Sequence, residues 1–179
     1  MKSEKQKIRD RIKLKWKKLT ETEKKSLAKN MLKQLENLSD WKKFTHILVF
    51  YPMSDEIPFW PELQKKFPEK HFYFPRVDKE MRFFLVKNSA DLISEKMGIM
   101  EPIKNLSEAQ YSHIDFALVP AVALGKNGER LGRGAGFYDR FLAKFPRIKT
   151  ASFVPNFALF DNLPTEKHDQ KIDWVLMEQ

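Results

Sequence analysis

Residues 130–142 read Arg-Leu-Gly-Arg-Gly-Ala-Gly-Phe-Tyr-Asp-Arg-Phe-Leu, and they hold three of the chain's six glycines. Glycine weakens helices and tolerates positive φ, so three glycines at alternate positions indicate a loop. The next apolar residues, Phe137, Phe141 and Phe145, recur at helical spacing. A glycine loop that opens a helix presents backbone N–H groups to anions. Arg130 and Arg133, before and after the first of these glycines, add positive charge, and the stretch predicts a phosphate-binding loop.

The spacing of this loop differs from two well-known phosphate-binding sequences. No Gly-Lys-Ser/Thr follows it, as a Walker A loop requires, and GxGxG is not the GxGxxG of dinucleotide-binding folds. A glycine-rich turn between two elements fits the glycine spacing equally well. The choice between these interpretations depends on the rest of the chain.

Composition indicates a folded protein. The chain has 179 residues, of which 42% are hydrophobic, and we expect residues 1–179 to form a single domain. It contains no cysteine, which excludes disulfides and zinc–thiolate sites. The N-terminus lacks the apolar segment of a signal peptide, and no apolar run approaches the roughly 18 residues of a membrane span. We therefore expect a cytoplasmic monomer without membrane association.

The positive charge is concentrated at the N-terminus. Residues 1–33 hold 13 Lys/Arg against 4 Asp/Glu, whereas the remaining 146 residues hold 20 of each. A nucleic-acid-binding arm, a solvated helix face or a source of phosphate-binding cations would each account for this excess. Ile8, Ile12 and Trp16 recur at helical spacing, so the segment is an amphipathic helix and not a free tail. Lys5 and Arg9, four residues apart, share a face beside the apolar stripe.

Apolar runs that alternate with helical patterns predict the fold class. We expect strands at 46–51, 71–74, 81–86, 115–120, 149–154 and 172–177, and helices at 3–19, after a capping box at 20–23, at 58–67 and after the glycine loop. Residues 88–97 are weakly helical. The alternation predicts an α/β fold, a three-layer α/β/α arrangement around a central mixed, mostly parallel sheet. Ligands bind such sheets beyond the carboxyl ends of the strands, where Glu56 follows the first strand.

The sequence offers little for covalent catalysis. No serine or cysteine elbow accompanies His168-Asp169, so a hydrolase triad is not indicated. The four histidines are scattered, which argues against a histidine metal site. Carboxylates such as Asp139 and Asp169 suit Mg²⁺, which prefers oxygen ligands beside substrate phosphates.

The motifs together resemble a known family. From Arg130 to Leu142 the chain matches the pattern Arg-Leu-Gly-x-Gly-x-Gly-Tyr/Phe-Tyr-Asp-x-(Phe/Tyr)-Leu, after a strand that ends in Val119-Pro120. Further matches, in the same order, are Lys5-x-x-x-Arg9, Tyr51 with Asp55-Glu56-Ile57, Gly98-x-x-Glu101-Pro102, and Leu163-Pro164 leading to His168-Asp169 and Asp173. The chain resembles the 5-formyltetrahydrofolate cyclo-ligase family, also called methenyltetrahydrofolate synthetases, over nearly its whole length.

The resemblance implies an ATP- and Mg²⁺-dependent ligase that closes 5-formyltetrahydrofolate to 5,10-methenyltetrahydrofolate. It implies that Tyr51 and Glu56 bind the folate, that Asp139 and Asp169 serve the metal, and that Tyr138 and Arg133 lie near the reacting groups. It assigns ATP binding to Lys5, Arg9, Arg130, Leu131, Gly132, Arg133, Gly134, Ala135, Gly136, Phe137 and Tyr138.

Two alternatives remain open at this point. The N-terminal positive charge is also compatible with a nucleic-acid-binding α/β module that uses the first two helices. The second alternative is a relative of this family that kept the fold but acts on another substrate, because fold does not fix function.

Overall fold

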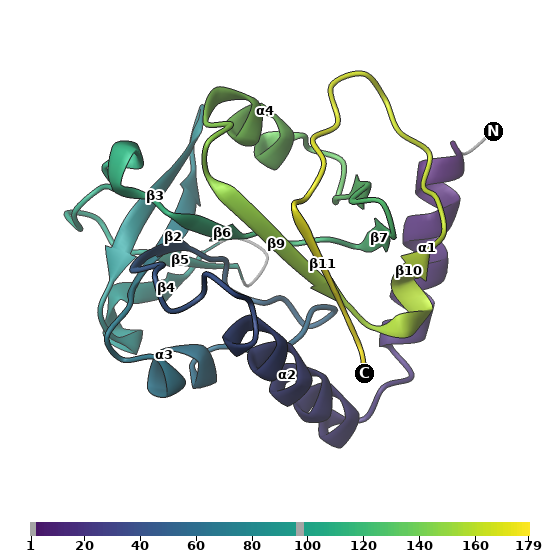
Figure 1. Ribbon diagram of the computed structural model, residues 1–179, viewed down its shortest axis with the longest axis horizontal. Coiled ribbons are helices and arrows are strands. Elements are labelled where there is room, and N and C mark those ends of the chain that lie inside the picture. The colour runs from purple at the N-terminus through teal and green to yellow at the C-terminus, as the bar shows by residue number, and fades with distance from the viewer. Residues whose placement is uncertain (1–2, 96–98) are drawn as a thin grey trace.

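The computed structural model describes residues 3–95 and 99–179 and has a six-stranded sheet at its centre (Figure 1). The strand order is β11-β9-β6-β1-β2-β3, and only the β2–β3 pair is antiparallel within this sheet. The strands are β1 (His46–Leu48), β2 (His71–Val77), β3 (Met81–Val86), β6 (Phe116–Leu118), β9 (Lys149–Val154) and β11 (Trp174–Met177). The prediction of a mixed, mostly parallel sheet is confirmed.

Helices and the loops beside them cover both faces of this sheet. They are α1 (Glu4–Trp16), α2 (Glu21–Glu36), α3 (Glu62–Lys66) and α4 (Phe137–Lys144). Trp41, which follows α2, packs edge-on against Phe116 of β6 at 5.6 Å between ring centroids. On the opposite face, Phe141 of α4 meets Phe83 of β3 at 4.9 Å. The strand register puts Phe116 and Phe83 on different faces, so aromatic contacts join the three layers.

Two small sheets extend the central one. Strands β7 (Ala123–Gly125), β8 (Arg130–Leu131) and β10 (Leu159–Phe160) form one of them, and β4 (Leu92–Ser94) pairs with β5 (Met100–Pro102) in the other. The helix expected at 88–97 is wrong, because a 3₁₀ turn, Ser89–Asp91, and β4 occupy the described part of it. Residues 96 and 97, with Gly98 of the sequence motif, lie outside the described residues.

Several strands end earlier than their apolar runs. The run at 46–51 stops being a strand at Leu48, and the run at 115–120 stops at Leu118. The residues after these ends are free to line a cavity at the carboxyl edge of the sheet. Strand β2 instead continues through Pro75, because β1 pairs only with residues 71–73 and leaves Pro75 with β3 as its strand neighbour.

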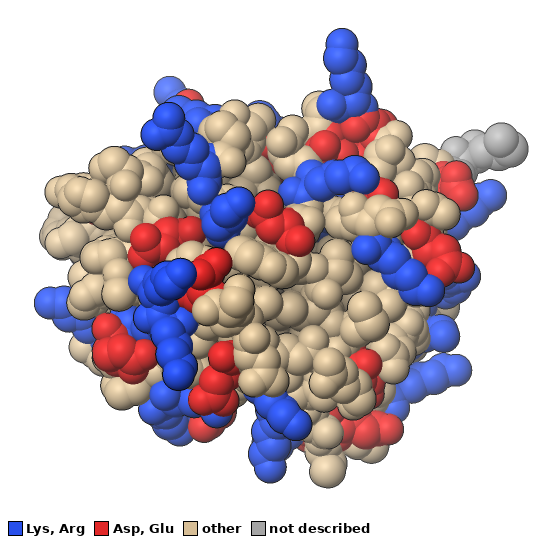
Figure 2. Space-filling view, in the orientation of Figure 1, with Lys and Arg blue, Asp and Glu red and all other residues tan. Residues whose placement is uncertain are grey.

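Helix α1 lies beside the small β7-β8-β10 sheet, at the right of Figure 1. Its Ile12 and Trp16 are buried, and Trp16 packs edge-on against Phe157 at 5.8 Å. Figure 2 shows positive and negative side chains interspersed over the visible face of the molecule, without a large patch of one sign. Within residues 3–95 and 99–179, no helix has the length and apolar character needed to cross a bilayer.

Replacing Ile12 with alanine should loosen α1 from the rest of the molecule. Ile12 is 1% exposed, so the truncation leaves a cavity, and we expect a loss of about 2–5 kcal/mol in the free energy of unfolding. Leu14→Ala on the same helix is the control, because Leu14 is 60% exposed and should change stability by less than about 0.5 kcal/mol. Urea denaturation of both variants measures the difference, and equal losses would contradict this packing.

Candidate active site

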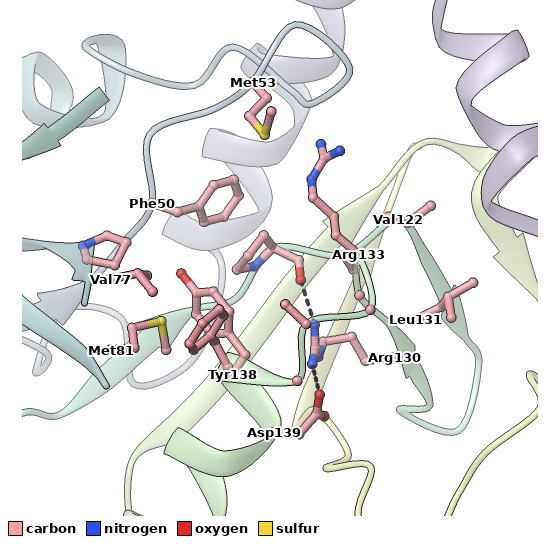
Figure 3. A pocket seen from close by; sticks show the side chains of 18 of the residues that line it. Phe50, Met53, Val77, Met81, Val122, Arg130, Leu131, Arg133, Tyr138 and Asp139 are labelled. Atoms are coloured by element: carbon pink, nitrogen blue, oxygen red, sulfur yellow. Dashed lines mark hydrogen bonds and ion pairs between the residues drawn. The ribbon is translucent and has the colours of Figure 1, made fainter. Parts of the chain in front are cut away.

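A cavity of about 600 Å³ lies beyond the carboxyl ends of β1 and β6, closed on one side by α1 (Figure 3). This is the size of a small-molecule site. Every residue predicted from the sequence to take part lines it, namely Lys5, Arg9, Tyr51, Glu56, Arg130, Leu131, Gly132, Arg133, Gly134, Ala135, Gly136, Phe137, Tyr138, Asp139 and Asp169. The structure brings these residues together, and the role of each remains a prediction.

Arg130 lies beneath the glycine loop and joins three segments. Its Nη2 donates to Asp139 of α4 at 2.9 Å, and its Nη1 donates to the carbonyl of Pro120 at 3.1 Å, as the dashed lines of Figure 3 show. A Cβ atom at Gly132 would lie 2.6 Å from Nη1 of Arg130. A side chain at 132 would therefore push the guanidinium out of its present position under the loop.

The loop above Arg130 has the character of an anion cradle. Gly134 has a φ of +104°, a region that side chains rarely tolerate. In the described part of the chain, the backbone N–H groups of residues 133–136 donate no hydrogen bond. Helix α4 begins at Phe137 without a side-chain cap, and no described residue accepts a hydrogen bond from the N–H groups of residues 137–139. A bound phosphate would satisfy such a row of donors.

Helix α1 contacts the cavity wall through Lys5 and Arg9, the two basic residues predicted to bind ATP. Arg9 Nε donates to the carbonyl of Gly132 at 2.8 Å, and Lys5 Nζ donates to Asp169 at 2.7 Å. Burial opposes ionisation of Asp169, but the hydrogen bond and charge of Lys5 hold its pKa below the usual range. These contacts join the N-terminal helix to the glycine loop and to the loop before β11.

Two consecutive carboxylates face the loop from the other side. Asp55 and Glu56 follow β1, and both accept hydrogen bonds from the guanidinium of Arg133, at distances between 2.6 and 3.2 Å. The second oxygen of Glu56 accepts from the backbone N–H of Met53 at 2.8 Å. Burial raises the pKa of Glu56 although the charge of Arg133 opposes that shift.

Two buried polar atoms in the cavity wall lack partners. Of the described side chains, four have a buried nitrogen or oxygen atom without a hydrogen bond, and two of these atoms are the hydroxyl of Tyr138 and Nε of Arg130. Burial, and to a lesser degree the charge of Glu56, raises the pKa of Tyr138. Its hydroxyl therefore stays protonated and is available as a donor to a ligand.

The acidic residues predicted for a metal do not converge on one point. Asp139 uses one carboxylate oxygen for Arg130 and the other for the backbone N–H of Gln170, at 2.9 and 3.1 Å. Asp169 instead lies with Glu166 and His168, whose possible ligand atoms are all within 4.8 Å of one another. The assignment of Asp139 and Asp169 to Mg²⁺ stays a prediction.

Sequence reasoning missed the apolar wall of the cavity. Figure 3 shows Val77 and Met81 beside Tyr138, with Phe50 and Met53 farther along the cavity. Glu101 of β5, which the sequence motifs include without a role, lines the same space. The strand pattern at 81–86 was a usable signal for a pleated segment, but it did not tell which side would face a ligand. No residue type in this wall is unusual for an ordinary core.

The comparison with protein families decides the relationship. A profile of the 5-formyltetrahydrofolate cyclo-ligase family matches residues 1–178. The chain belongs to this family. The identification from the sequence motifs is therefore confirmed.

Individual relatives agree with the family assignment. The chain is 38% identical over 87 residues to a Mycolicibacterium smegmatis 5-formyltetrahydrofolate cyclo-ligase, a match that spans 48% of this chain and 45% of the relative's length. It is 27% identical over 152 residues to the Haemophilus influenzae enzyme of the same name, covering 79% of this chain and 80% of the relative. A solved Aquifex aeolicus 5,10-methenyltetrahydrofolate synthetase is 29% identical with a TM-score of 0.84, covering 97% of this chain and 89% of that one.

Removing the Tyr138 hydroxyl should not lower stability. Because this buried hydroxyl has no partner, we expect Tyr138→Phe to keep or raise the free energy of unfolding. Tyr111→Phe is the matched control, since the Tyr111 hydroxyl accepts from the backbone N–H of Phe83 at 3.2 Å and its loss should cost about 1 kcal/mol. Urea denaturation compares the two, and a clear loss in Tyr138→Phe would show that the hydroxyl has a partner in solution.

Proposed function

We propose that the protein catalyses the ATP-dependent closure of 5-formyltetrahydrofolate to 5,10-methenyltetrahydrofolate, with release of ADP and phosphate. One observation carries the proposal. The amide-lined glycine loop and the buried carboxylate of Glu56 face a single cavity, in a chain of the cyclo-ligase family. The protein would act as a monomer in the cytoplasm.

The phosphate side of the cavity fits a nucleoside triphosphate. The unpaired N–H groups of residues 133–136 would hold the terminal phosphates, together with the unpartnered Nε of Arg130. Arg9 and Lys5 of α1 would add positive charge from the facing wall. ATP supplies the phosphoryl group that turns the formyl oxygen into a leaving group.

The opposite side fits the folate. A pterin ring presents N–H donors at one edge, and the largely buried Glu56 carboxylate is an acceptor that would pair with them. The apolar wall of Phe50, Met53 and Met81 would take the flat ring faces, with Tyr51 beside it. The side chain of Arg133 extends from the loop to Glu56, and its guanidinium would meet both ligands.

The chemistry needs positioning more than a reactive side chain. A formamide carbonyl is a poor electrophile, because N5 donates electrons into it. Once the formyl oxygen carries a phosphoryl group, N10 attacks the formyl carbon, loses its proton, and phosphate leaves as the ring closes. Arg133 and the N–H groups would stabilise charge on the transferring phosphoryl group, and the Tyr138 hydroxyl would donate to an oxygen nearby.

A magnesium ion would neutralise charge between the phosphates. Asp169 would hold it from the α1 side of the cavity, where Glu166 and His168 offer further ligand atoms. Asp139 would contribute only after one of its oxygens gives up its contact with Arg130 or Gln170. Oxygen-rich groups beside substrate phosphates are the usual environment of Mg²⁺ in proteins.

The nucleic-acid alternative has no support in this fold. Lys5 and Arg9 lie in the cavity wall and are engaged by Asp169 and Gly132, so they do not form part of an exposed basic stripe. The apolar face of α1 is buried.

The direct test is conversion of the folate by purified protein. With Mg-ATP and 5-formyltetrahydrofolate, we expect the absorbance of the methenyl product to appear, and without ATP we expect no change. Release of ADP should match product formation. A folded preparation that produces no ATP-dependent absorbance would refute the proposed activity.

Replacing Glu56 with glutamine should separate the two ligands. Loss of a charged acceptor for the pterin should raise KM for the folate by about 10- to 100-fold, whereas a nucleotide analogue should bind at least as tightly as before. Glu62→Gln on α3 is the control, because Glu62 pairs with exposed Lys65 away from the cavity and should leave both constants unchanged. Isothermal titration and steady-state kinetics supply the two readouts. Equal weakening of folate and nucleotide would contradict the assigned role.

A further inference from the structure

The guanidinium of Arg133 contacts its two acidic partners differently. Asp55 receives two parallel bonds, from Nη2 to Oδ1 at 2.6 Å and from Nη1 to Oδ2 at 3.2 Å. Glu56 is reached through one oxygen, Oε1, which accepts from Nε at 3.2 Å and from Nη2 at 3.0 Å. The two-point pairing with Asp55 fixes the plane of the guanidinium. The contact with Glu56, made through a single oxygen, is easier to exchange for a contact with a ligand.

The carboxylates also differ in surroundings. Burial works against ionisation of Asp55, but the hydrogen bonds and charge of Arg133 hold its pKa below the usual range. Glu56 is the more buried of the two, with 11% of its side chain exposed against 24% for Asp55. Asp55 does not line the main cavity, whereas Glu56 and Arg133 do. Asp55 therefore lies behind Arg133 as seen from the cavity, and Glu56 lies beside it.

Arginine has five N–H donors, and this arrangement uses four of them. A phosphate that binds Arg133 strongly has to take over the donors now directed at Glu56. Glu56, in turn, has to release Arg133 before Oε1 can accept from a folate N–H group. Binding of either ligand therefore breaks the Arg133–Glu56 contact, which competes with binding of the other ligand.

We propose that Asp55 is a positioning residue that holds Arg133 at the cavity while Glu56 exchanges its contact with Arg133 for the folate and Arg133 takes a phosphate. This inference rests on the proposed function. Its consequence is positive coupling, in which the folate tightens nucleotide binding and the nucleotide tightens folate binding by the same factor.

The coupling is measured without turnover. Isothermal titration of a non-hydrolysable Mg-ATP analogue, with and without saturating 5-formyltetrahydrofolate, should give a dissociation constant at least about fivefold lower when the folate is present. A constant that changes by less than twofold would show that the Arg133–Glu56 contact is not exchanged, and would overturn the proposal. Because no product is formed, this result is independent of whether the protein catalyses ring closure.

The role of Asp55 is tested by Asp55→Asn with the folate present. Without its two-point anchor, Arg133 has to be ordered by the ligand, and the analogue should bind about three- to tenfold more weakly. Simple removal of a negative charge near a phosphate predicts the opposite, tighter binding. Asp55→Glu keeps a carboxylate and should recover part of the affinity, and kcat/KM for ATP should fall in step with analogue affinity.

Asp161→Asn is the matched control, since Asp161 forms an exposed ion pair with Lys126 at 2.6 Å outside the cavity. It should leave the analogue's dissociation constant unchanged. Tighter binding in Asp55→Asn, or a lower melting temperature with unchanged affinity, would overturn the positioning role. Failure of the absorbance assay with the expected binding changes intact would refute the activity and leave this role standing.

Discussion

The site depends on one buried charge. The side chain of Arg130 is 3% exposed, and an arginine in that position must be paired and hydrogen-bonded, since an uncompensated buried charge costs several kcal/mol. Its partners come from the loop after β6 and from the first turn of α4. The pairing fixes where α4 starts relative to the end of β6, and the glycine loop connects β8 to α4 above this junction. A side chain at 132 would displace the guanidinium, because the charge occupies the space that a Cβ atom would fill.

The same region contains buried polar atoms that have no hydrogen-bond partner. A core optimised for stability alone would pair such atoms. The Tyr138 hydroxyl and Arg130 Nε lack partners although the surrounding aromatic residues pack closely. Most buried polar groups in native proteins are hydrogen-bonded, and exceptions call for a reason. Both residues line the cavity, where a ligand's oxygen atoms would offer partners. Leaving these atoms unpaired lowers the stability of the fold, which is consistent with a region organised for ligand binding.

Much of the fold could be predicted from local pattern. The capping box at Thr20 and Glu23 begins α2 as expected, and the strand at 149–154 has the expected bounds. Local pattern failed where structure depends on distant partners. Residues 92–94 form a strand because residues 100–102 pair with them, and no propensity in a weakly helical segment signals that pairing.

Prediction of the site likewise succeeded for local motifs and failed for contacts between distant residues. The glycine loop and Glu56 belong to sequence motifs, so the sequence alone assigned both to the site, and both line the cavity. The link between Arg133 and Asp55 could not be predicted, because it joins residues 78 positions apart in sequence. The two carboxylates predicted for a metal were assigned from residue type and from the family resemblance. The structure shows that Arg130 already engages one of them, a competition that sequence cannot reveal.

Helix α1 shows why the concentration of positive charge at the N-terminus is misleading when it is read alone. A basic amphipathic segment is ordinarily interpreted from its charge, yet the position of this helix is set by its apolar face, with Ile12 and Trp16 buried. Lys5 and Arg9 are four residues apart on this helix, so they share one flank of it. Once Ile12 and Trp16 are packed, that flank meets Asp169 through Lys5 and the glycine loop through Arg9. The cavity wall is thus completed by a segment more than a hundred residues from the loop it faces, and the site exists only when the N-terminal helix is docked.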